Sequence, residues 1–173
     1  MFGIFKKKKS SQSGDSSRVV LLCELYVNLS NDITNLYQEF PDANPAEIHF
    51  FAMSATSVFA QGFGEHKTNA MHDLIERFTE QSVANLLFHM PKADYSRVHN
   101  AYIARFRDYA ALVTRAFNAR TNQESQDSSY LLVVEMDSHI GVDRGAFAKS
   151  VAGLEIAPLL AEFAVKVSDA MLT

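Results

Sequence analysis

The stretch that decides the fold is Val19–Phe40, VVLLCELYVNLSNDITNLYQEF. Its apolar residues recur at alternating intervals of three and four, at positions 19, 22, 26, 29, 33, 36 and 40. This spacing predicts a helix with one continuous apolar stripe. Further apolar residues widen the stripe: Val20, Cys23, Val27 and Tyr37. Such a stripe is typical of a bundle seam, inside one chain or across a homodimer, and we expect the intrachain seam because later segments offer matching faces.

Proline and glycine residues divide the next part of the chain into further helices. A second helix over 45–61 follows the capping residue Asn44, and its nearly uniform apolar character indicates a central position. A third helix is expected over 68–90. A fourth is expected over 95–119, after Asp94 as its cap.

The C-terminal third of the chain gives weaker signals. Residues 121–129 contain no apolar side chain and predict an exposed loop. The run Tyr130–Met136 fits either a short buried strand or a helix, and we expect a helix because a lone strand is not stable. A short helix over about 143–153 and a last helix that Pro158 starts or kinks complete the chain.

Composition limits the fold class. The chain has 173 residues, of which 47% are apolar, so it suits a single domain with a substantial core. Its 7 Gly and 4 Pro argue against a loop-rich all-β fold, and its single Cys excludes a disulfide framework or a Cys-based zinc site. We predict an all-α fold, a single helical bundle of five to six helices over 18–173, with a disordered N-terminal leader over 1–17.

Charge is distributed unevenly along the chain. Four of the 16 basic residues are Lys6–Lys9, which leaves 12 basic against 20 acidic residues and a net charge of −8 for the rest. An acidic body repels nucleic-acid phosphates, so we expect no nucleic-acid partner. The same acidity favours association with a basic protein.

The leader combines an apolar start with a lysine cluster: Phe2, Ile4 and Phe5, then Lys6, Lys7, Lys8 and Lys9. This order is the reverse of a secretory signal, so we expect a cytoplasmic protein. Each lysine near an anionic leaflet contributes about 1 kcal/mol, which predicts weak, reversible contact with the inner face of a membrane. A peripheral membrane protein acting through this tail is one alternative function.

A histidine–aspartate pair suggests a second alternative. Neither the Glu-x-x-His motif of di-iron bundles nor His-Glu-x-x-His occurs in the chain. The pair His72-Asp73, with His49 upstream and Asp137 downstream, resembles the motif of HD-domain metal-dependent phosphohydrolases, which are also all-helical. The resemblance implies that these four side chains hold a divalent cation that activates water.

The predicted fourth helix carries the only basic surface that we expect on the acidic body: Arg97, Arg105, Arg107 and Arg115. No catalytic motif or cofactor motif accompanies it. We therefore expect a non-enzymatic protein-binding module of the adaptor, regulator or toxin-inhibitor type, with no cofactor and with a basic protein as its partner.

Overall fold

The computed structural model describes residues 9–63, 68–88, 90, 93–119 and 121–172. Nearly all of these residues are helical, and no strand occurs among them. The helices are α1 (Lys9–Leu36), α2 (Pro45–Phe63), α3 (Thr68–Phe88), α4 (Tyr95–Phe117), α5 (Asn122–Ile140) and α6 (Ala146–Leu172). The predicted all-α bundle is confirmed, with six helices.

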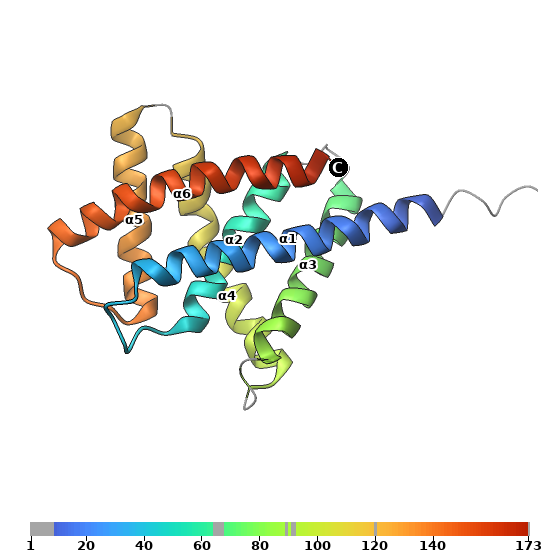
Figure 1. The fold of residues 1–173 in the computed structure, drawn as a ribbon, viewed down its shortest axis with the longest axis horizontal. Helices are drawn as coiled ribbons and strands as arrows, with labels where there is room; N and C mark the ends of the chain where they lie inside the picture. The colour runs from blue at the N-terminus through green and yellow to red at the C-terminus, as the bar shows by residue number, and fades with distance from the viewer. Residues whose placement is uncertain (1–8, 64–67, 89, 91–92, 120, 173) are drawn as a thin grey trace, which may run out of the picture.

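Helix α2 lies at the centre of the bundle and packs against each of the other five helices (Figure 1). It is buried along most of its length, including Phe51, Met53 and Ala55. Ser54 and Thr56 donate to backbone carbonyls four residues earlier, as where Ser54 Oγ donates to the carbonyl of Phe50 at 2.7 Å. The mixture of large and small side chains lets the surrounding helices approach closely, and the predicted central position is confirmed.

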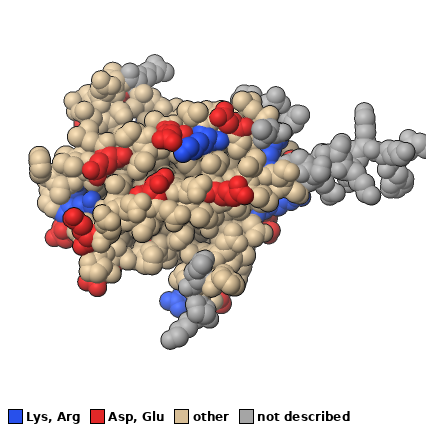
Figure 2. Space-filling view, viewed as in Figure 1, with Lys and Arg blue, Asp and Glu red and all other residues tan. Residues whose placement is uncertain are grey.

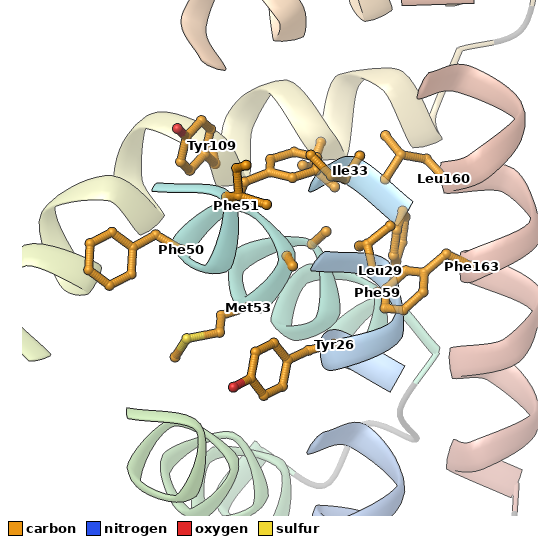
Figure 3. Close-up of a cluster of buried hydrophobic side chains, with 14 of the residues drawn as sticks. Tyr26, Leu29, Ile33, Phe50, Phe51, Met53, Phe59, Tyr109, Leu160 and Phe163 are labelled. Atoms are coloured by element: carbon orange, nitrogen blue, oxygen red, sulfur yellow. The ribbon is translucent and has the colours of Figure 1, made fainter. Parts of the chain in front are cut away.

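Helix α1 buries the predicted apolar stripe. Tyr26, Leu29 and Ile33 reach into the core beside residues of α2 and α6 (Figure 3). Leu36 and Phe40, at the end of the stripe, are half-buried against the same core. The stripe therefore forms a seam within the chain, as expected.

Helix α1 begins at Lys9, and residues 1–8 of the predicted leader lie outside the described residues. One detail of the first-helix prediction is wrong. Val20 and Val27 do not widen the stripe, because they are 56% and 36% exposed. Both lie roughly 130° around the helix from the centre of the stripe and so point to solvent.

Helix α4 begins where the sequence predicts. The Asp94 side chain accepts a hydrogen bond from the backbone N–H of Arg97 at 2.8 Å, which satisfies one free donor of the first turn. The buried side chains Val98, Tyr102 and Tyr109 then follow at helical spacing. These residues pack α4 against α2.

The expected loop over 121–129 is wrong, because α5 begins at Asn122. Thr121 caps the helix by accepting a hydrogen bond from the N–H of Glu124 at 3.1 Å. Ser128 and Ser129 are buried where α5 crosses α6, and a Cβ added at Gly153 would lie 3.3 Å from the Ser129 carbonyl carbon. The two helices approach closely at this crossing, so only small side chains fit. The serines are present because they are small, and their polarity does not indicate a loop.

The two predicted C-terminal helices form one helix, α6, which continues through Pro158. Proline inside a helix removes a hydrogen bond and costs about 3 kcal/mol. Apolar residues on both sides of the proline, Ile156 and Leu160, are buried in the same core. Burial of this continuous face against α1, α2 and α5 offsets the cost and keeps the helix unbroken.

Candidate functional site

An apolar groove opens between the ends of α2 and α4, the start of α5, and α6. Its volume is about 420 Å³. Phe117 packs edge to face against Phe59 and Phe63, with ring centroids 5.2 and 5.4 Å apart, and these rings form one wall. Phe117 is 44% exposed and Val165, on the α6 side, is 61% exposed. The groove is therefore an open apolar surface, and its aromatic wall is held in place by packing.

The outer surface of α1 and α6, next to this groove, is acidic. We call it the α1–α6 face, and its exposed carboxylates are Glu24, Asp32, Glu155, Glu162 and Asp169. They are spread across the surface where α1 and α6 run side by side (Figures 1 and 2). Lys166 lies among them and forms an ion pair with Glu162 at 2.7 Å.

Asp169 connects the groove and the α1–α6 face. It lines the groove together with Ser168 and Val165, and it also belongs to the exposed acidic row of α6. A ligand seated in the groove would therefore have a carboxylate within reach at its edge. This combination favours an apolar group that carries a positive charge beside it.

The predicted basic face of α4 is only partly present. Arg97, Arg107 and Arg115 are exposed, but Arg105 turns inward. Its Nε donates to Glu47 Oε2 of α2 at 2.8 Å, and this hydrogen bond raises the pKa of Arg105. The sequence missed this pair because Glu47 belongs to the first turn of α2, where a carboxylate is expected to serve the helix terminus.

A second polar cluster joins α4 and α5. The Nε2 atom of His139 lies 2.9 Å from Glu135 Oε1 and 3.3 Å from Asp108 Oδ2. These three side chains are the group of possible metal ligands that the described part of the chain brings together. None of the three belongs to the metal site that the sequence predicts, at His49, His72, Asp73 and Asp137.

The predicted metal ligands His49, His72, Asp73 and Asp137 are not brought together. They lie on α2, α3 and α5, and they do not form a metal-ligand group among the described residues. His72 and Asp73 are exposed on α3, whereas His49 is half-buried with its ring 6.1 Å from that of Tyr26. The HD-type hypothesis gains no support from this geometry.

Asp137 instead belongs to a buried contact between helices. The Tyr37 hydroxyl donates to Asp137 Oδ1 at 2.8 Å, and Arg144 Nε lies 3.3 Å from the same oxygen. The Arg144 guanidinium stacks over the rings of Tyr37 and Phe40, 4.3 and 4.7 Å from their centroids. This clasp fastens the end of α1 to α5 and to the segment before α6.

Most of the predicted membrane-contact residues lie outside the part of the chain that the structure describes. Phe2, Ile4, Phe5 and Lys6–Lys8 lie outside the described residues, and Lys9 is the first residue of α1. None of the described helices is long and apolar enough to cross a bilayer.

Comparison with protein-family models, with curated proteins and with solved structures finds no match to this chain.

Proposed function

We propose that this chain is a non-enzymatic protein-binding module that holds an amphipathic helix of a basic partner protein. The observation that carries the proposal is the apolar groove that opens beside the α1–α6 face. An apolar anchor of the partner helix occupies the groove, between Phe117 and Val165. Lysine or arginine residues next to that anchor meet Asp169 and Glu162. Helix-in-groove binding commonly combines such anchors with flanking charges.

The size and charge of the groove support this occupant. A volume of about 420 Å³ lies within the range of roughly 300–1,000 Å³ typical of pockets that enclose a ligand. The carboxylates of the α1–α6 face outnumber Lys166, so they attract a basic partner and repel an acidic one.

Selection from a library of helical peptides tests the proposal with the full chain. We expect selected peptides to carry apolar residues on one face with Lys or Arg beside them. We also expect Val165→Glu to raise their Kd at least tenfold, as measured by fluorescence anisotropy. Added negative charge alone would strengthen binding of a basic peptide, so a loss of affinity identifies the groove. Val151→Glu is the matched control, because Val151 is 39% exposed on the same helix and does not line the groove.

The salt dependence of association tests the role of the acidic face. The on-rate should fall as the ionic strength rises from about 0.1 M, where the Debye length is roughly 10 Å, to 1 M, where it is roughly 3 Å. Selection of acidic peptides, or equal Kd values for the wild type and Val165→Glu, would overturn the proposal.

A further inference from the structure

We propose that Asp108, Glu135 and His139 form a binding site for a first-row divalent cation, with Zn²⁺ as the best fit. The site lies between α4 and the C-terminal half of α5, whereas the groove takes up the N-terminal residues Ser125 and Ser129 of the same helix. The inference is independent of the proposed peptide-binding function.

The ligand atoms of the three side chains all lie within 4.8 Å of one another. Glu135 and His139 are four residues apart and therefore lie on one face of α5. Zinc bonds to imidazole nitrogen and carboxylate oxygen measure about 2.0–2.2 Å, so ligand atoms around a tetrahedral ion lie roughly 3.4 Å apart. The His139 Nε2 atom lies 2.9 Å from the Glu135 carboxylate and 3.3 Å from that of Asp108. Small side-chain adjustments would bring all three onto one ion.

His139 lacks a hydrogen bond at the nitrogen that faces the two carboxylates. Its Nε2 atom is buried and makes no hydrogen bond of good geometry, despite the short distance to Glu135. A metal ion is bound through the nitrogen lone pair and does not need a proton pointed at either carboxylate. The His139 side chain is 16% exposed, whereas Asp108 and Glu135 are 39% and 37% exposed, which leaves a path for the ion to enter.

Tyr109 supplies a second, independent observation. Its side chain is fully buried, and its hydroxyl finds no hydrogen-bond partner among the described residues. The hydroxyl interacts electrostatically with Glu47 and Arg105 and, more weakly, with Glu135 and Asp108. The Tyr109 ring lies edge-on to His139, with centroids 5.6 Å apart. A buried hydroxyl without a partner costs free energy, so the site is incomplete as it stands. A water molecule on the bound ion would accept or donate the missing hydrogen bond.

The carboxylates of Asp108 and Glu135 also favour a cation between them. The two carboxylates face the single imidazole of His139. Arg105 neutralises Glu47 at 2.8 Å and lies farther from Asp108, at 3.8 Å. One nitrogen with two carboxylate oxygens suits Zn²⁺ or Mn²⁺, whereas Mg²⁺ prefers oxygen ligands alone and retains its waters.

Titration of the chelator-treated full chain with Co²⁺ tests the site, because cobalt reports its coordination through visible absorption bands. We expect one equivalent to bind, Zn²⁺ to displace it and Mg²⁺ to fail to do so. His139→Gln and Asp108→Asn should each weaken binding at least tenfold. Asp108→Asn preserves the side-chain shape, so it keeps the test valid even if His139→Gln disturbs folding. Tyr109→Phe should weaken binding by about tenfold, as expected for a group that orients a ligand.

The control is the exposed His72-Asp73 pair of α3, changed to His72→Gln and Asp73→Asn. We expect this variant to bind Co²⁺ as the wild type does. Equal binding by the wild type and His139→Gln would overturn the proposal. It would also be overturned if nuclear magnetic resonance showed a protonated His139 in the wild type that persisted at one equivalent of Zn²⁺, because the imidazolium would then supply the positive charge.

Discussion

Helix α5 carries two carboxylates two residues apart, Glu135 and Asp137, and the bundle surrounds them in opposite ways. Asp137 is 1% exposed, and one of its oxygens faces both Tyr37 and Arg144. The side chain of Glu135 is 37% exposed and faces His139. Asp137 lies beside Tyr37, and Glu135 lies near Tyr109. Only Tyr37 donates a hydrogen bond to its carboxylate.

The difference between the two tyrosines separates a structural cluster from a candidate binding site. Tyr37 donates to Asp137 at 2.8 Å, whereas the hydroxyl of Tyr109 has no partner among the described residues. Burial raises the pKa of both phenols, so both remain protonated donors at neutral pH. The clasp balances its carboxylate with a guanidinium, whereas the Glu135 cluster has two carboxylates around one imidazole. Both clusters contain buried polar atoms without a hydrogen-bond partner, Arg144 Nε and Asp137 Oδ2 in the clasp and the Tyr109 hydroxyl near Glu135. The carboxylates near Tyr109 face an imidazole, which is a metal ligand, and not a guanidinium.

The largest expected effect is the loss of the clasp. Asp137→Ala leaves Arg144 buried, with its side chain 8% exposed, and without a counter-charge. Breaking a buried ion pair from one side costs about 3–5 kcal/mol. Urea unfolding should show this decrease in the free energy of unfolding, whereas Asp143→Ala, at an exposed neighbouring position, should change it by less than about 0.5 kcal/mol. A loss below about 1 kcal/mol would mean that Arg144 reaches solvent when its partner is gone.

A matched pair of tyrosine variants sharpens the comparison. Tyr37→Phe removes a hydrogen bond to a charged group, which should lower the free energy of unfolding by about 1.5–3 kcal/mol. Tyr109→Phe removes a buried hydroxyl that has no partner, so its effect should lie between no change and a gain of about 1 kcal/mol. Both values are measured by urea unfolding in the presence of a chelator. Equal losses for the two variants would remove the distinction between the clusters.

The pH dependence of stability should reflect the burial of Asp137. Burial raises its pKa above the ordinary value of 3.8, while Tyr37, Arg144 and Lys149 oppose the rise and Asp143 adds to it. A carboxyl that binds its proton more tightly in the folded chain favours folding when protonated, and this contribution is lost as the pH rises from 3.8 through the raised pKa. Asp137→Asn cannot ionise, so its stability relative to the wild type should increase across that interval. Parallel curves of unfolding midpoint against pH would contradict this expectation.

The sequence predicts the parts of the fold that depend on local signals. The stripe over 19–36 and the Asp94 cap follow from spacing and residue type alone, and both are confirmed, although α1 ends at Leu36 and Phe40 lies beyond it. The polar composition of 121–129 predicts a loop, but these residues start α5, where Ser128 and Ser129 are buried against Gly153 of α6. Pro158 predicts the start or a kink of a helix, but α6 continues through it because apolar residues on both sides are buried. Both errors concern contacts between segments that composition does not reveal.

The candidate cation site was partly visible in the sequence. Of the 6 histidines in the chain, only His139 follows a carboxylate by four residues, which places both groups on one helical face. The Glu-x-x-His and His-Glu-x-x-His motifs use other spacings. The third member, Asp108, is brought there by the packing of α4 against α5. Asp137, which the resemblance to HD-domain proteins implied as a ligand, is two residues from Glu135 on α5 and therefore points to nearly the opposite side of the helix, toward Tyr37 and Arg144.

The smallest expected effect decides whether the Glu135 cluster stabilises the fold. Glu135 is partly exposed and its pair with His139 is screened by solvent, so Glu135→Gln in the presence of a chelator should change the free energy of unfolding by less than about 1 kcal/mol. The measurement is the same urea titration used for Asp137→Ala. A cost as large as that of Asp137→Ala would show that Glu135 holds α5 in place as Asp137 does, and the two carboxylates would then be equivalent. A small cost combined with weaker Co²⁺ binding would mean that the bundle folds without this cluster and keeps it for a ligand.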